Sequence, residues 1–130
     1  TWTPVIGGSS GTSGQTYGIQ AGTYTKVGNM CIASGYLTLQ AKGTISNTLQ
    51  IHGFPFTSRN VTNNLSAVAL ARVEAWSLSD DHTLCCHLSE NGTKATFTTY
   101  AGATSAHVTL TTDQLTNTSS LIFSLTYHTT

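Results

Sequence analysis

Charged residues are scarce in this chain of 130 residues. Five Lys and Arg balance five Asp and Glu, so only 8% of the residues are charged and the formal net charge is zero. Globular domains usually contain about 25% charged residues. Without a basic surplus the chain cannot neutralise a run of phosphates, which argues against a nucleic-acid partner.

Long apolar runs are missing as well. No stretch of 18 or more apolar residues occurs, and no amphipathic segment is rich in Lys or Arg, so the sequence predicts no insertion into a membrane and no binding along its surface. Apolar residues still make up 38% of the chain, including 11 aromatics, which is too many for a disordered tail. We expect one domain, residues 1–130, with a single core.

Carboxylates are too few for a recognisable hydrolytic site. A glycosidase needs two carboxyl groups about 5 to 9 Å apart, whereas Asp80 and Asp81 are adjacent and would point apart in extended chain. No Gly-x-Ser-x-Gly elbow of an esterase is present. The Gly/Ser stretch 7–14 reads as a loop, because it lacks the Lys-Ser/Thr ending of a phosphate-binding loop. The sequence therefore predicts no catalytic residues and no enzyme activity. The other three carboxylates are Glu74, Glu90 and Asp113.

Cysteine is limited to three residues, an odd number that does not form a disulfide framework. We expect free thiols in a protein made in a reducing cytosol, with Cys31 and Cys86 on apolar faces of strands and Cys85 on the opposite face. Zinc needs three or four convergent ligands at characteristic spacings. The segment that holds His82, Cys85, Cys86 and His87 lacks those spacings, so no metal and no cofactor is predicted there.

The residues that are abundant carry hydroxyl groups and form strands. Thr and Ser supply 39 of the 130 residues. Several segments alternate apolar and polar residues with a period of two, and almost none has a helical period. Residues 65–76 read as one strand, with Leu65 and the alanines on one face and Arg72, Glu74 and Trp76 on the other; a helix is the rival interpretation. The other predicted strands are 31–42, 48–51, 84–89, 95–100, 108–112 and 121–127.

Turn residues separate these strands. Asn91-Gly92 between two strand-like runs is a strong hairpin signal. Gly35, inside the first predicted strand, suggests a bulge or a bend. Seven or eight short strands with frequent turns predict an all-β fold, an antiparallel β-sandwich or jelly roll.

Several phrases together resemble a known family. They are Thr1-Trp2-Thr3-Pro4, Thr16-Tyr17, the stretch from Gln20 to Asn29, Lys42-Gly43, Ile51-His52-Gly53-Phe54-Pro55-Phe56, and the stretch from Leu115 to Ser124 followed by Tyr127. The string resembles the C-terminal β-sandwich domain of tail fibres, tailspikes and related proteins of tailed bacteriophages. Phe54 stands where that family usually has Leu, and residues 76–100 follow no family pattern.

The resemblance implies a jelly-roll-like, non-enzymatic distal domain of a homotrimer in the virion tail, which binds a host-surface polysaccharide and assists trimerisation. The alternative is a purely structural trimerisation, capping or decoration domain without a ligand of its own. In a trimer one histidine per chain (His52, His107 or His128) could hold an axial metal, which the sequence leaves open. The chain begins without Met or a signal-like segment, so we expect it to be the end of a longer protein without a signal peptide.

Most of the matched residues read as structural. Gly22 is expected in a turn that enters a strand, and 117–120 in a turn before the last strand. Lys26 shares a face with Tyr24 and could lie over a ring or pair with a carboxylate. Pro55 would direct Phe54 and Phe56 toward the core as a plug at one end of the sandwich.

The predicted receptor patch lies in the unmatched middle of the chain. Sugar sites combine aromatic faces with amide, carboxylate and hydroxyl groups. Exposed aromatics beside an acidic loop therefore indicate a glycan-binding patch, with the alternative that the two aromatic residues cover a sheet face or a subunit interface. The patch consists of Trp76, Asp80, Asp81, His82 and Tyr100.

Overall fold

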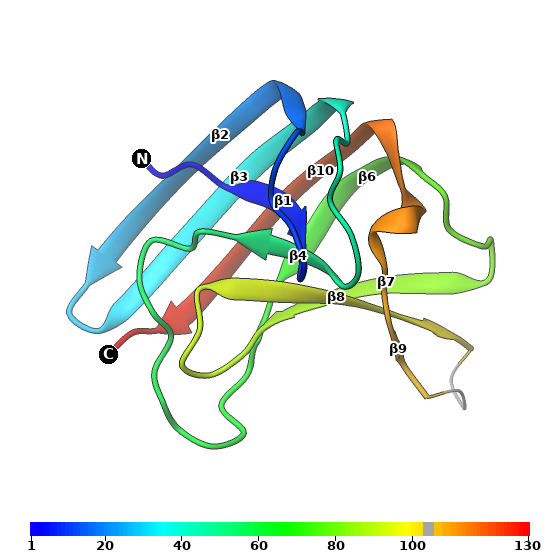
Figure 1. The fold of residues 1–130 in the computed structure, drawn as a ribbon. Coiled ribbons are helices and arrows are strands. Elements are labelled where there is room, and N and C mark those ends of the chain that lie inside the picture. The colour runs from blue at the N-terminus through cyan, green and yellow to red at the C-terminus, as the bar shows by residue number, and fades with distance from the viewer. Residues whose placement is uncertain (103–105) are drawn as a thin grey trace.

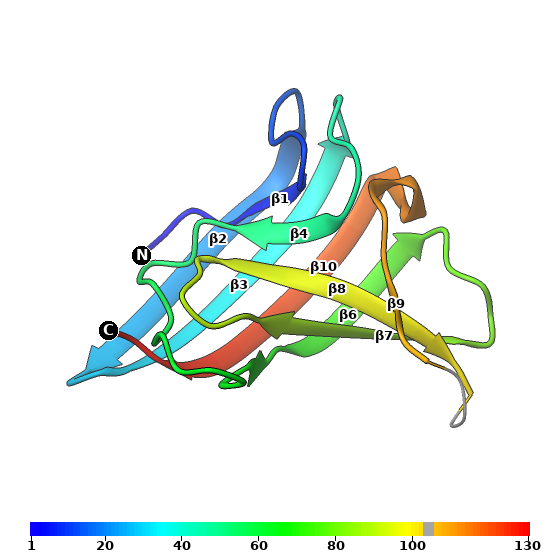
Figure 2. The ribbon, with the colours of Figure 1, turned by 60° about the horizontal axis from the view of Figure 1, so that its bottom comes forward.

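The computed structural model describes residues 1–102 and 106–130, which form two packed antiparallel sheets (Figures 1 and 2). The four-stranded sheet has the order β2-β3-β10-β6, and the six-stranded sheet has the order β1-β4-β8-β7-β5 with β9 paired to β8. The predicted all-β sandwich is confirmed. The strands are β1 (Val5–Gly8), β2 (Thr16–Val27), β3 (Met30–Ala41), β4 (Leu49–His52), β5 (Ser66–Ala67), β6 (Ala69–Trp76), β7 (His82–Leu88), β8 (Lys94–Ala101), β9 (Val108–Thr109) and β10 (Leu115–His128), with a 3-10 turn at Thr112–Gln114.

Period-two alternation builds the core where the sequence predicts it. The apolar faces of β3 and β10, neighbours in the four-stranded sheet, point at the six-stranded sheet and are almost fully buried. Cys31 and Cys86 are buried and Cys85 is half-buried, so the predicted faces of the three free thiols are confirmed. Burial raises the pKa of the Cys86 thiol, which keeps it protonated.

Residues 65–76 do not form the single strand that the alternation predicts. They form β5 in the six-stranded sheet and β6 in the four-stranded sheet, with the chain crossing between the sheets at Val68. Positive φ angles at Arg72 (48°) and Ala75 (57°) then interrupt the alternation inside β6. As a result Val68 is buried and Trp76 packs against the core, while the alanines lie outside.

Glycines in β2 and β3 allow close packing and do not make turns. Gly22 lies in the middle of β2, so the expected turn there is wrong, and it pairs in register with Gly35 of β3. No register shift occurs at Gly35, so the expected bulge is also wrong. A Cβ atom at Gly22 would lie 2.7 Å from Trp2 Nε1, and one at Gly35 would lie 2.4 Å from Phe123 Cζ. Both positions need glycine because an aromatic side chain lies directly against the backbone.

The sequence segments that match the family lie close together in the fold and contact one another. Phe54 is buried and stacks on Trp2 with ring centroids 5.0 Å apart, and it also contacts Phe123 and Tyr127. Phe56 is only partly buried, and Lys26 Nζ lies 5.3 Å from its ring centroid, as predicted for Lys26.

The segment 117–120 belongs to β10 and is not the expected turn. Two register shifts between Leu115 and Ile122 mark bulges in its pairing with β6. The Lys42 backbone N–H donates to Asn117 Oδ1 (3.0 Å), and Lys42 Nζ donates to the Thr112 carbonyl oxygen (3.1 Å). This contact joins two of the matched phrases, which lie 75 residues apart in the chain.

Candidate functional site

The loop between β6 and β7 carries the acidic part of the predicted patch. Asp80 and Asp81 are exposed in this loop, and Asp81 Oδ1 lies 3.9 Å from Nε2 of His82, the first residue of β7. The loop lies at one end of the β7–β8 hairpin (Figure 1), where His82 pairs with Ala101 and Thr83 with Tyr100. The structure therefore brings Asp80, Asp81 and His82 together.

Trp76 lies apart from these residues because its ring points into the sandwich. The indole ring centroid is 5.4 Å from that of Phe97, and Nε1 donates to the Ser120 carbonyl oxygen at 3.1 Å. This is the alternative interpretation of Trp76, in which it covers a sheet face. The sequence placed it outside because the positive φ angles in β6 are not visible in an alternating pattern.

Tyr100 lies on the other side of the β7–β8 hairpin from His82. Phe97 and Thr99 of β8 face the interior, so Tyr100 faces outward, opposite to Phe97 as predicted. His82 shares the inner face of β7 with Leu84 and Cys86. The five predicted residues therefore divide between the core, the end loop and the outer face of the six-stranded sheet.

His82 lines a groove of about 310 Å³ at the end of the sandwich. Its other walls are the loop after β6 and the segment from β9 to the 3-10 turn, which are joined by a hydrogen bond from the Ser77 backbone N–H to the Gln114 carbonyl oxygen (2.7 Å). Thr111 Oγ1 donates to Gln114 Oε1 (2.9 Å), which orients that amide. The polar groups in the groove are hydroxyls and an amide beside the imidazole. They come from Ser77, Ser79, His82, Thr99, Thr109, Thr111 and Gln114.

Sequence reasoning missed most of this groove. Residues 108–112 were predicted as a strand, but only Val108–Thr109 pair with β8, and the next residues bend into the 3-10 turn that faces Ser77. Nothing in the local pattern places Gln114 beside Ser77, because they meet only through the pairing of the end of β6 with the start of β10, where Trp76 lies opposite Leu115. The abundance of Thr and Ser was the available signal, and it is spread over the whole chain.

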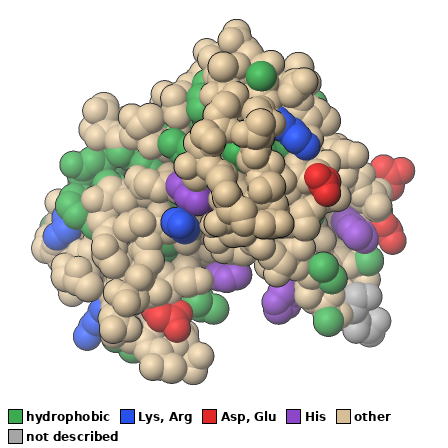
Figure 3. Space-filling model, viewed as in Figure 1, with side chains coloured by type: hydrophobic (Ala, Val, Ile, Leu, Met, Phe, Trp, Pro, Cys, Tyr) green, Lys and Arg blue, Asp and Glu red, His purple; other side chains and the backbone are tan. Residues whose placement is uncertain are grey.

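The charge around the site is low, as it is over the molecule. Figure 3 shows one face of the protein, on which charged side chains are few and scattered. In residues 1–102 and 106–130 the ion pair is Arg72–Glu74, beside the contact of His82 with Asp81, and no group of three or more His, Cys, Asp or Glu side chains is arranged to hold a metal ion. An axial ion held by one histidine per chain, which the sequence leaves open, is not tested by a single chain. Within the described chain no helix is long and apolar enough to cross a membrane.

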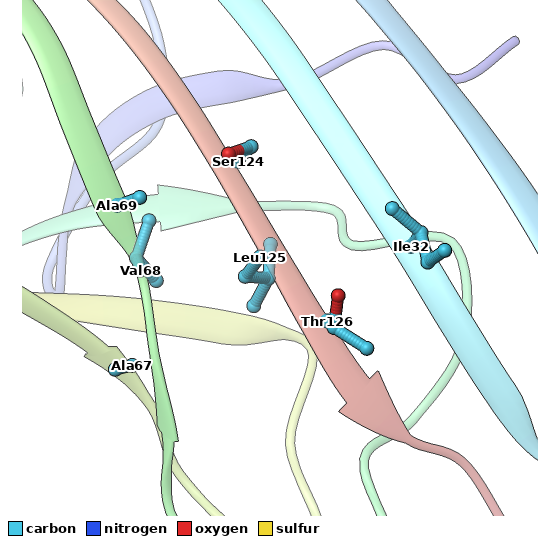
Figure 4. Close-up of a pocket in the computed structure, with 7 residues that line it drawn as sticks. All are labelled: Ile32, Ala67, Val68, Ala69, Ser124, Leu125 and Thr126. Atoms are coloured by element: carbon cyan, nitrogen blue, oxygen red, sulfur yellow. The ribbon is translucent and has the colours of Figure 1, made fainter.

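A second surface feature lies on the outside of the four-stranded sheet. Where the chain passes from β5 to β6, a hollow of about 370 Å³ opens beside β10 (Figure 4). Ile32, Ala69 and Thr126 line it, and none of its lining residues is charged. A smaller hollow of about 240 Å³ lies over Gly22 and Gly35 on the same sheet. The outer face of this sheet is thus uncharged along most of β2, β3 and β10.

Comparison with known proteins adds one structural relationship. No protein-family model and no curated protein matches the chain. The structure is similar to the crystal structure of the Dettilon tailspike protein, with a TM-score of 0.74 and 17% sequence identity over 97% of this chain. The chain has a tailspike-related fold. The match covers 22% of the Dettilon protein, so this chain spans about a fifth of the length of that tailspike.

Proposed function

We propose that this chain is a domain of a tailed-bacteriophage tail fibre or tailspike that binds a host-surface glycan and assembles as a homotrimer in the virion tail. The observation that carries the proposal is the tailspike-related fold over 97% of the chain. The proposal agrees with the family resemblance of the segments at both ends of the sequence. These segments form the aromatic cluster of Trp2, Phe54, Phe123 and Tyr127 and the contact of Lys42 with β10.

The end groove is the proposed glycan site. Sugars are bound by hydroxyl, amide and carboxylate groups on a largely preformed surface. The groove offers hydroxyls, the Gln114 amide and the His82 imidazole, with the Asp81 carboxylate at its edge. Hydrogen bonds between its walls hold these groups in place before a ligand arrives, which lowers the entropy cost of binding. We propose binding without catalysis, because Asp80 and Asp81 are neighbours in one exposed loop and do not face each other across the groove.

The proposal is tested on an array of bacterial capsular and O-antigen polysaccharides with the fluorescently labelled protein. We expect binding to one structural class, and we expect His82→Ala and Gln114→Ala each to weaken it about fivefold, since a hydrogen bond contributes about 1 kcal/mol. Tyr100→Ala on the same hairpin is the matched control and should bind as the unmodified protein does.

Two outcomes would change the assignment. If Tyr100→Ala alone weakened binding, the receptor site would lie on the outer face of the six-stranded sheet. If the protein bound no polysaccharide, the second function would be favoured, a structural domain that only joins subunits. The uncharged outer face of the four-stranded sheet supports that second function, because a symmetric assembly must cover one such face on each protomer.

A further inference from the structure

A second groove, of about 420 Å³, lies on the outer face of the six-stranded sheet. Strands β4 and β8 form its floor, with Gln50 opposite Thr96 in register and Lys94 two residues before Thr96. The β7–β8 turn (Ser89–Thr93) and the loop after β4 form its walls. Its volume lies within the usual range of about 300 to 1,000 Å³ for small-molecule sites. It shares no lining residue with the end groove.

Hydrogen bonds of one buried serine, Ser58, join the two walls of this groove. Ser58 is 4% exposed; its hydroxyl donates to the Ser89 carbonyl oxygen and accepts from the Gly92 backbone N–H at 3.0 Å. The Ser58 backbone N–H also donates to the Gly92 carbonyl oxygen at 2.9 Å. Asn91 takes the positive φ (52°) that this turn requires. A ligand therefore meets a wall that is already ordered, so little entropy is lost in fixing it.

The floor of the groove contains the Gln50 side-chain amide, whose nitrogen has a hydrogen-bond partner and whose oxygen has none among the described residues. Gln50 Nε2 donates to Thr96 Oγ1 at 3.2 Å, while Gln50 Oε1 is buried and has no hydrogen-bond partner among the described residues. An unpaired buried acceptor is costly, and a ligand hydroxyl that reaches the floor would pair with it after a small rotation of the amide. Thr57, Ser89 and Asn91 add hydroxyl and amide groups around the floor. This arrangement suits a ligand with several hydroxyl groups.

Lys94 gives the groove its charge. It is the charged residue of the lining; Glu90 belongs to the β7–β8 turn but is not among the residues that line the groove. Among the described residues no carboxylate lies within salt-bridge distance of Lys94. His52 faces Lys94 across the β4–β8 pair, and burial, with the nearby Lys94 ammonium, lowers the pKa of His52. The imidazole is thus held neutral near pH 7, and the ammonium of Lys94 is the cation that a ligand meets.

We propose that this groove binds an acidic saccharide, with Lys94 pairing with the carboxylate of a hexuronic acid residue and Gln50 and Thr96 binding its hydroxyls. The site stands apart from the end groove, so it is independent of whether the end groove binds glycan. A neutral saccharide would leave the Lys94 ammonium unpaired, and a small anion without hydroxyls would leave the polar floor unused.

The test is a titration followed by backbone amide NMR, with trigalacturonic acid and a glucuronate-containing tetrasaccharide as probes and the methyl ester of trigalacturonic acid as the neutral control. We expect shifts confined to residues 50–58 and 89–96 with at least one acid probe. The ester should bind about tenfold more weakly, as expected for the loss of a charge-assisted hydrogen bond. Lys94→Gln should reproduce that tenfold loss, whereas Arg72→Gln, which removes a cation from the other sheet, should change nothing.

Three results would overturn the proposal: no shifts with either acid, equal affinity for acid and ester, or unchanged affinity in Lys94→Gln. Because Lys94 is exposed, the variant should fold like the unmodified protein, which its amide spectrum verifies. Shifts at residues 77–82 and 108–114 would assign the probe to the end groove, so failure here is distinguishable from failure of the proposed function.

Discussion

Gly35 has no side chain, and this allows the ring of Phe123 to pack closely in the aromatic cluster. The ring of Phe123 lies directly against its backbone, and Phe123 in turn contacts Trp2 and Phe54 at centroid distances of 6.1 and 6.2 Å. The position therefore links the N-terminal segment, the loop after β4 and β10. A methyl group at residue 35 would have to displace a buried ring that is only 1% exposed.

We expect Gly35→Ala to lower the free energy of unfolding by about 1 to 3 kcal/mol, the usual cost of overpacking a core. Gly11→Ala is the matched control, because a Cβ there has its nearest neighbour at 3.8 Å, and its effect should stay within about 0.5 kcal/mol. Urea denaturation followed by tryptophan fluorescence measures both. Similar stability of the two variants would show that Phe123 moves aside without cost.

At the scale of one residue several sequence predictions are found in the structure. The position of Lys26 beside a ring and the outward direction of Tyr100 follow from period two, and the burial of Phe54 follows from the neighbouring Pro55. Trp76 does not follow period two, because positive φ angles at Arg72 and Ala75 turn its ring inward. Such angles in residues other than glycine are imposed by tertiary packing and leave no local signal.

The Tyr127 phenol helps to hold β10 to the loop after β4, beside a hydrogen bond from the Arg59 backbone N–H to the His128 carbonyl oxygen (2.8 Å). Tyr127 Oη accepts from the Phe56 backbone N–H at 3.3 Å and donates to the Phe56 carbonyl oxygen at 3.1 Å. Tyr127 is 2% exposed, and Phe56 lies under Lys26 of β2. The hydroxyl thus fixes the loop whose Ser58 orders the β7–β8 turn.

We expect Tyr127→Phe to lower the free energy of unfolding by about 1 to 3 kcal/mol at neutral pH, because two backbone groups of Phe56 lose their partner. Burial and the neighbouring Cys31 raise the pKa of Tyr127, so the folded state keeps the phenol proton above about pH 10, where the unfolded chain releases it. Its contribution is therefore complete below pH 10 and decreases as pH rises further. The alkaline loss of stability, measured by urea denaturation from pH 8 to 11, should be shallower in Tyr127→Phe than in Tyr36→Phe. Parallel curves for the two variants would contradict this role.

The elements that the sequence predicted are those with one buried face. The core strands β3 and β10 and the Asn91 hairpin were predicted near their observed places. Strand β2 was missed because, apart from Gly22 and Tyr17, its residues are exposed on both faces of an edge strand, so no alternation marks it. The end groove was missed for a related reason. Its walls are brought together only because the chain crosses between the sheets after β5, which places the end of β6 beside the start of β10.

On the whole molecule, the outer face of the four-stranded sheet is nearly uncharged and exposes several isoleucines among its hydroxyl groups. The outer face of the four-stranded sheet exposes Ile19, Ile32 and Ile122, and its charged residues are Arg72, which lies over the Tyr36 ring at 5.5 Å, and its partner Glu74. A chain with few charges depends on hydroxyls for its solubility, and on this face Ser34, Thr38, Ser124 and Thr126 separate the isoleucines. The exposed isoleucine side chains are then costly to leave in water. Covering this face with other copies of the same chain accounts for both the proposed homotrimer and the low charge.

We expect the unmodified protein to sediment as a species of three times the 13.7 kDa chain mass. Ile32→Lys and Ile122→Lys should each convert it to a monomer, because an interface through this face would bury an unpaired ammonium, which costs several kcal/mol. Val61→Lys is the matched control, since Val61 is exposed in the loop between β4 and β5, and it should remain trimeric. Sedimentation equilibrium gives the mass, and circular dichroism verifies that each variant is folded. A monomeric unmodified protein would refute the trimer, whereas a trimer that survives both lysine substitutions would place the subunit interface on another face.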